Sequence, residues 1–108
     1  MPIMAIYRSS EVDPETFNRY RAEVPIEPPP QGAIFHQVGF DKDGLLVVDV
    51  WENEAALKAF GEAKIYPALR KMGITAIEPQ VIEVHALWAV PNAQQHNVAA
   101  PLPRSVPA

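Results

Sequence analysis

Asp49 is the single charged residue in the apolar run "LLVVDV" at residues 45–50. Such a carboxylate either points to water from one face of a strand or lies in a pocket where it can do chemistry. His36, in the preceding run "GAIFHQVGF", is its candidate partner. A carboxylate fixes the tautomer of an imidazole and raises its basicity, so the couple can act as a general base near neutral pH. His36 and Asp49 are therefore the predicted catalytic residues.

The loop "DKDG" at residues 41–44 decides whether these two side chains meet. If all four residues form the loop, His36 lies directly across from Asp49, with Cβ atoms roughly 5 Å apart. A two-residue turn at Asp43–Gly44 leaves them diagonal on one face, and a three-residue loop puts them on opposite faces. Three interpretations stay open: a polar pair that stabilises the sheet or a dimer seam, an acid–base couple, and simple solvent exposure.

Other residue types suited to binding a substrate are spread over the chain. Tryptophan side chains serve as core or interface anchors or as ligand platforms, and tyrosines either pack or present hydroxyls to a cavity. A histidine near the edge of a sheet is either a solvated edge residue or a contact. The predicted substrate-binding residues are Trp51, Tyr66, Tyr7 and His85. No spacing of histidines and acids specifies a metal site, so none is predicted.

Composition excludes several classes of protein. The chain has 108 residues, enough for one small domain, and no cysteine, which excludes disulfides and thiolate chemistry. A net charge of -4 offers no basic stripe for phosphates, so nucleic acid is not an expected partner. No stretch approaches the roughly 20 apolar residues of a membrane span, and the N-terminus does not resemble a signal peptide. A cytoplasmic protein without a membrane partner is expected.

Helix caps and turn residues predict a β-α-β-β-α-β order. Asp13 is a typical N-cap with Pro14 at the first helical position, and Asn53 can cap a second helix. Pro67 predicts a break near residues 64–66, followed by further helical turns that end at Gly73. The expected elements are strands at 2–8, 32–40, 45–52 and 80–88, with helices that start at Asp13 and Asn53.

Proline-rich stretches mark the domain limits. The "PIEPPP" stretch at 25–30 is too short for a linker and reads as a stiff connection between two elements. Residues 91–108 are rich in Pro and Ala and have few groups able to pack. We therefore expect one α+β domain at residues 1–90 and a flexible C-terminal tail at 91–108, with draping over a partner subunit as the alternative.

The predicted strands are too apolar to leave either face of the sheet in water. In residues 45–51 both alternating sets of side chains are dominated by large apolar groups. A sheet buried on both sides needs a second layer, and an identical sheet from another copy supplies one. The predicted partner is therefore a second copy in a homodimer.

The pattern resembles a known family. The passages "VVDVWENEAALKAF", "YPALRKMG" and "VIEVHAL" are similar to the dimeric α+β barrel superfamily, in its antibiotic-biosynthesis-monooxygenase-like branch. The resemblance covers residues 2–88 and implies a ferredoxin-like four-stranded antiparallel sheet. It also implies cofactor-independent chemistry on a small aromatic or polyketide-like ligand, with Trp51 matching the tryptophan of the family's strand-to-helix passage. Heme-degrading members use an asparagine on the first strand, which this chain lacks there.

Three functional hypotheses follow, each from a different class. The first is a cofactor-free enzyme that oxygenates its substrate or cyclises or isomerises it by acid–base catalysis. The second is a ligand-binding module that uses the same pocket without turnover. The third is a dimerisation domain in which the polar pair only specifies strand register.

Overall fold

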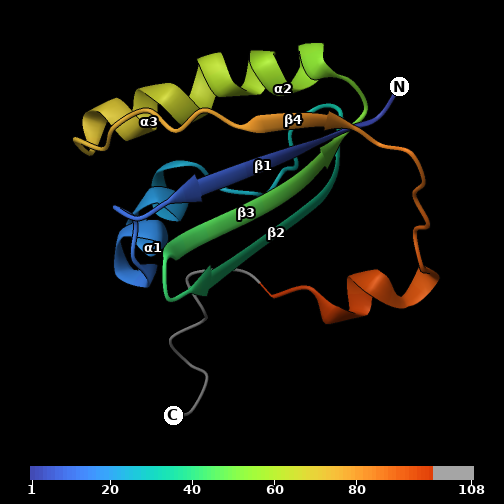
Figure 1. Cartoon of the computed structure of the whole chain (residues 1–108), viewed down its shortest axis with the longest axis horizontal. Helices are drawn as coiled ribbons and strands as arrows, with labels where there is room; N and C mark the ends of the chain where they lie inside the picture. Colours follow the sequence, from blue (N-terminus) through green and yellow to red (C-terminus); the bar gives the residue numbers. More distant parts are fainter. Residues whose placement is uncertain (99–108) are drawn as a thin grey trace.

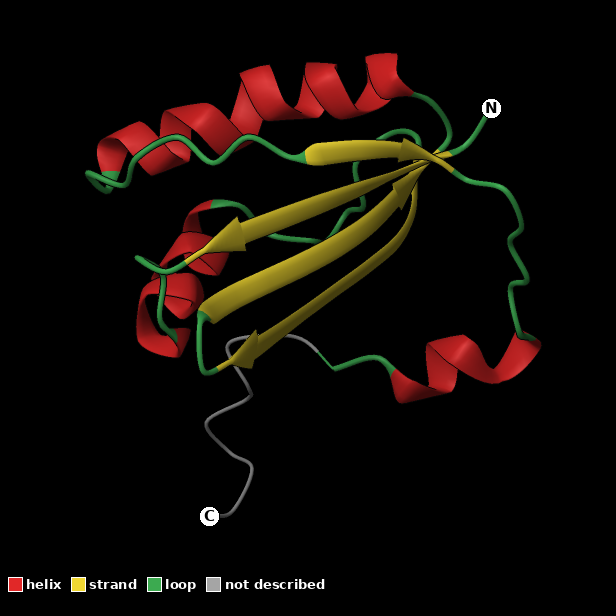
Figure 2. Cartoon of the chain, viewed as in Figure 1, coloured by secondary structure: helices red, strands yellow, loops and turns green. Residues whose placement is uncertain are grey.

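The computed structural model describes residues 1–98, and the rest of the predicted tail lies outside the described residues. The fold is α+β, with one four-stranded antiparallel sheet in the order β2-β3-β1-β4 (Figures 1 and 2). Its strands are β1 Ile3–Ser9, β2 Ala33–Asp41, β3 Gly44–Trp51 and β4 Gln80–Glu83. This is the ferredoxin-like arrangement that the sequence predicts. None of the helices in residues 1–98 is long and apolar enough to cross a membrane.

The helices begin at the predicted caps. Helix α1, Pro14–Glu23, starts after Asp13, whose carboxylate accepts a hydrogen bond from the Thr16 N–H at 2.7 Å. Helix α2, Glu54–Phe60, starts after Asn53, whose side chain accepts from the Ala56 N–H at 2.8 Å. Each cap satisfies one of the N–H groups that a helix start leaves without a partner.

The expected helix break before Pro67 does not occur. A π-helical turn, η1 at Gly61–Ile65, instead joins α2 to α3, Tyr66–Lys71. The Tyr66 N–H donates to the Gly61 carbonyl, five residues back, and this wider turn accommodates the proline that follows. The helical segment closes as predicted, at Gly73 with a φ of 72°.

The hairpin between β2 and β3 has the register that brings His36 opposite Asp49. The Asp41 carboxylate accepts a hydrogen bond from the Asp43 N–H at 2.7 Å, and Gly44 takes a φ of 116° that favours glycine. The turn therefore centres on Lys42 and Asp43, within the "DKDG" loop.

Helices cover one face of the sheet, which we call the covered face. Side chains of alternate residues of β1 and β3 form the core there together with Val12, which precedes α1, and with Phe17 and Leu57 from the helices. Figure 1 shows α1 behind the sheet and the α2–α3 segment along the β4 side. The strand residues of this core are Ile3, Ala5, Tyr7, Leu45, Val47 and Trp51.

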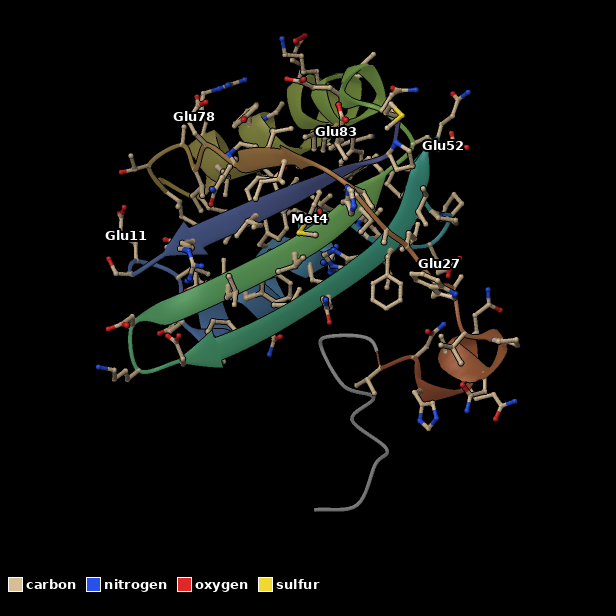
Figure 3. The ribbon with its side chains drawn as sticks, turned by 45° about the vertical axis from the view of Figure 1, so that its right-hand side comes forward. Met4, Glu11, Glu27, Glu52, Glu78 and Glu83 are labelled. Carbon is tan, nitrogen blue, oxygen red and sulfur yellow. The ribbon has the colours of Figure 1, made fainter. Side chains whose placement is uncertain are left out.

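The opposite face, which we call the open face, carries apolar side chains of which several are exposed, and no helix of residues 1–98 lies over it (Figure 1). Met4 lies on it, as Figure 3 shows, and its neighbours across the ladders are Val50 and Ile82. Ile82 and Phe35 are 39% and 46% exposed. This face is therefore the apolar surface that, according to the sequence, a second layer should cover.

The last strand is shorter than the predicted 80–88. Strand β4 ends at Glu83, and the Val84 N–H makes one further bond to the Pro2 carbonyl. Strand β1 begins at Ile3, so the chain beyond Val84 has no further strand to pair with. It then leaves the sheet, Trp88 is 84% exposed, and a short 3₁₀ segment, η2, forms at Pro91–His96 (Figure 1).

Candidate functional site

His36 and Asp49 form a hydrogen-bonded pair on the covered face. The imidazole Nδ1 lies 2.6 Å from the Asp49 Oδ1, as the facing register of β2 and β3 requires. Ala5 is the β1 neighbour of Asp49, and its small side chain leaves the carboxylate room beside the ladder. Of the three arrangements that the sequence leaves open, the structure adopts the direct pairing.

Arg21 of α1 extends this pair into a chain of three side chains. Its Nη2 lies 2.7 Å from the His36 Nε2, and its Nη1 donates to the Val24 carbonyl at 2.9 Å. A guanidinium can only donate, so Nε2 must accept, and the Nδ1 therefore carries the proton that it donates to Asp49. In this arrangement a neutral imidazole connects a cation to an anion.

The two members of the pair differ in their access to solvent. The side chain of Asp49 is 10% exposed and that of His36 is 36% exposed. The carboxylate thus lies behind the imidazole, because β3 is an inner strand while β2 is at the edge of the sheet. A buried orienting group with an accessible base is the arrangement that general acid–base catalysis uses.

Two tyrosines bring phenol groups to the same region. Tyr7 shares the covered face with Asp49, and burial, reinforced by the Asp49 carboxylate, raises its pKa well above the ordinary value. Burial raises the pKa of Tyr20 on α1 to about 12, with the Arg21 guanidinium acting in the opposite direction. Both phenols therefore remain neutral hydrogen-bonding groups at physiological pH.

Trp51 lies on the covered face at the end of β3, two residues after Asp49. It is 3% exposed, and its ring packs against Phe60 with a centroid distance of 5.5 Å. Its indole N–H is buried without a hydrogen-bond partner among residues 1–98. A buried donor of this kind costs free energy unless a partner is supplied, so the indole N–H is available to donate to a ligand acceptor.

Tyr66 lies in a surface depression that does not include His36. Together with Leu69, Arg70 and Ile74 it lines a surface depression of about 290 Å³. A second depression, of about 240 Å³, lies at the hairpin end of the sheet and is lined by Arg8, Ser9 and Asp41 among others. Neither is lined by His36 or Asp49, so the pair is reached through the exposed edge of the imidazole rather than through these hollows.

His85 lies apart from the pair in sequence and in the sheet. It follows the end of β4 by two residues and is exposed. Within the part of the chain that the structure describes, no cluster of three or more histidines and acids is placed to hold a metal ion. The prediction of a site without metal or cofactor stays a prediction.

Arg21 and Tyr20 belong to this site but are not among the residues that the sequence predicts for it. Phe17, Tyr20 and Val24 mark the buried side of α1 by their helical spacing, and Arg21 follows Phe17 by four residues. An arginine on the apolar side of a helix is the signal that could have found it, although its partner in β2 depends on how α1 packs on the sheet.

Comparisons with known proteins agree with this architecture. A scan of the sequence against protein-family models finds no match, and a search of curated proteins finds none either. A solved structure from Deinococcus radiodurans, provisionally named an antibiotic biosynthesis monooxygenase, matches 83% of this chain and 98% of its own, with a TM-score of 0.55 at 15% identity. This likeness shows that the chain shares the fold of that structure.

A second solved structure, a protein from Shewanella oneidensis, matches 75% of this chain and 86% of its own, with a TM-score of 0.47 at 14% identity. At 15% identity, the match to the Deinococcus radiodurans structure supports the fold alone. That fold is the one that the sequence resemblance implies. Activity therefore has to be argued from the side chains that this fold positions.

Proposed function

We propose that this monooxygenase-like chain is a small-molecule enzyme that needs no cofactor and acts on a small aromatic or polyketide-like substrate. The observation that carries the proposal is the 2.6 Å bond between His36 and Asp49, in which the carboxylate is buried and the imidazole is accessible. His36 is the proposed base and Asp49 the residue that orients it.

The proposed reaction begins with a proton transfer. The substrate gives up an acidic O–H or C–H proton to the Nε2 of His36, and the resulting imidazolium is stabilised by the Asp49 carboxylate. The substrate is left as an anion. Such an anion is the common starting point for reaction with molecular oxygen and for an acid–base cyclisation or isomerisation, so one site serves either outcome.

Other residues of the covered face are proposed to contact the substrate. Trp51 offers an indole N–H without a partner in residues 1–98, and Tyr7 offers a neutral phenol on the same face. Tyr66 and His85 stay predicted contacts, each in its own place on the molecule.

A second candidate function is a module that binds a ligand or dimerises without turnover. The observation that favours it is the occupied lone pair of His36 Nε2, which accepts from Arg21 in this conformation. In that case the three side chains only specify the register of β2 on β3 and the position of α1.

We also propose that two copies associate through their open faces. The exposed apolar groups on this face, Phe35 and Ile82 among them, would be buried against the same groups of a second copy. A cytoplasmic location stays a prediction of the sequence.

The test compares activity and stability in two variants. With a panel of phenolic and polyketide-like compounds, Asp49→Asn and His36→Gln should each lower turnover by roughly 10²-fold or more, because both disable the base. An oxygen electrode separates oxygenation from cyclisation or isomerisation. Melting temperatures measured on the same samples should change little for the nearly isosteric Asp49→Asn.

Matched controls exist for both substitutions. Glu52→Gln repeats the acid-to-amide change at an exposed site, and His96→Gln repeats the histidine change in η2. A structural pair predicts the reverse result: unaltered ligand handling, with a loss of about 1–3 kcal/mol of stability in Asp49→Asn and His36→Gln. That pattern would eliminate the acid–base function.

A further inference from the structure

Arg21 carries a positive charge that residues 1–98 do not neutralise by direct contact. The ion pairs in this part of the chain are His36–Asp49 and Lys71–Glu23. Arg21 reaches the Asp49 carboxylate only through the neutral imidazole of His36. A half-buried cation in this position lacks the direct anionic partner that such a group usually has.

The guanidinium is held in place by few hydrogen bonds and by aromatic contacts. It donates to the Val24 carbonyl and to the His36 ring, which leaves further N–H groups of its fork available. Its central carbon lies 5.1 Å from the centroid of the Phe17 ring and 5.8 Å from that of Tyr20. These rings restrict the guanidinium plane, so less conformational entropy is lost when it binds an oxygen ligand.

Partial burial strengthens any bond that this group makes to an anion. Burial lowers the pKa of Arg21, while the nearby Tyr20 and Asp49 act in the opposite direction. The group remains charged at physiological pH, since an arginine pKa lies far above that range. A charged donor with reduced solvation favours an oxyanion over a neutral oxygen.

We propose that Arg21 is the anion-recognising residue of this site, and that its ligand presents a phenolate, enolate or carboxylate oxygen beside the Nε2 of His36. The proposal deepens the proposed function, because it places the ligand at His36, but anion binding does not require turnover. The partly exposed ring of Tyr20 beside the guanidinium suits a ligand whose acidic oxygen is attached to a flat, unsaturated ring.

The replacement of Arg21 by a ligand at the His36 Nε2 conserves protons and electrons. A ligand hydroxyl displaces Arg21 from the His36 Nε2 and transfers its proton to that nitrogen, while the negative charge left on the ligand oxygen pairs with the guanidinium. The imidazolium then lies between the Asp49 carboxylate and the ligand. A ligand that arrives already ionised pairs with Arg21 directly, and no group is oxidised or reduced in either case.

Two near-isosteric probes test this assignment. 4-Nitrophenolate carries the acidic oxygen, and nitrobenzene lacks it. The unmodified protein should bind 4-nitrophenolate at least about tenfold more tightly than nitrobenzene, as judged by titration calorimetry. Arg21→Gln should remove most of this preference and leave nitrobenzene binding unchanged.

Arg19→Gln is the matched control, because Arg19 lies on the same helix and is exposed. It should bind both probes as the unmodified protein does. Equal affinity of the Arg21→Gln variant and the unmodified protein for 4-nitrophenolate would overturn the assignment. So would the absence of 4-nitrophenolate binding, or of any preference over nitrobenzene, in the unmodified protein.

A measurement on the unmodified protein covers the case in which Arg21→Gln does not fold. The ¹⁵N resonance of the His36 Nε2 should shift when 4-nitrophenolate is added and stay in place when nitrobenzene is added, because only a ligand with the acidic oxygen displaces Arg21 from that nitrogen. An unmoved resonance at saturating 4-nitrophenolate would contradict the assignment.

The outcomes separate this inference from the proposed function. Loss of anion preference in Arg21→Gln, with no effect of Asp49→Asn on turnover, supports the anion site and eliminates the acid–base enzyme. A large effect of Asp49→Asn on turnover, with unchanged anion binding in Arg21→Gln, supports the acid–base enzyme and eliminates the anion site.

Discussion

The covered face of the sheet carries the chain Arg21–His36–Asp49, whereas the open face carries apolar groups such as Met4 and Ile82, over which no helix of residues 1–98 lies. Burial ordinarily favours apolar side chains and exposure favours polar ones. Here the more buried face contains the carboxylate, and the more exposed face is apolar.

The buried carboxylate and the exposed apolar face each have their own physical explanation. A buried carboxylate costs free energy unless it is hydrogen-bonded, and His36 supplies that bond. An exposed apolar face costs free energy unless another surface covers it. The contrast supports the two proposals made above, chemistry or ligand binding on the covered face and association of copies through the open face.

The largest effect is expected from a charge placed on the open face. Val48, opposite Gln37 on the ladder, lies at the centre of this face, and Val48→Lys would bury an unpaired ammonium between two sheets. The dimer dissociation constant should rise by about a thousandfold, which sedimentation measurements can follow.

Ser10→Lys provides the control for that substitution, because it adds the same charge at an exposed position beyond β1. It should leave the dissociation constant unchanged. If the unmodified protein is a monomer at micromolar concentration, the contrast between the two faces has a different explanation.

A smaller effect is expected from the phenols near the covered face. The folded pKa of Tyr20 is raised from 10 to about 12, so the folded state favours the neutral phenol. The associated stability is complete below the unfolded pKa and is lost as pH rises through about 12. Tyr20→Phe removes this ionisation, and it should reduce the loss of stability between neutral pH and pH 11 by about 1 kcal/mol.

Alkaline unfolding followed by circular dichroism checks this expectation, with Tyr66→Phe as the comparison. The pKa of Tyr66 is also raised by burial, but this residue is much less buried than Tyr20. Its substitution should move the alkaline midpoint less. An equal shift of the alkaline midpoint in both variants would show that Tyr20, beside Arg21, is no more desolvated than Tyr66.

The smallest effect is expected from the tail, whose described residues follow the last strand of the sheet. Residues 92–98 are almost entirely exposed, so deletion of residues 92–108 should lower the melting temperature by less than about 5 °C, or about 1 kcal/mol. Differential scanning calorimetry and light scattering measure stability and association on the same sample. A larger drop, or weaker association, would show that the tail docks on a subunit.

Local chemistry explains why much of the fold is predictable from the sequence. Asp13 and Asn53 cap their helices because their side chains bond N–H groups only three residues away. Gly73 ends the last helix because its positive φ suits glycine. Prediction failed at Pro67, where a π-helical turn replaced the expected break, and at β4, whose end depends on where β1 begins.

The sequence by itself determined that His36 and Asp49 lie on adjacent strands joined by a short turn-forming loop, and so that they could meet. Only the tertiary structure decided that they do, because a one-residue change of register would place them on opposite faces. The position of Arg21 against His36 was likewise decided by the packing of α1 on the sheet through Phe17 and Phe40, whose rings lie 6.3 Å apart. Contacts between elements distant in the chain depend on such packing, which no local spacing specifies.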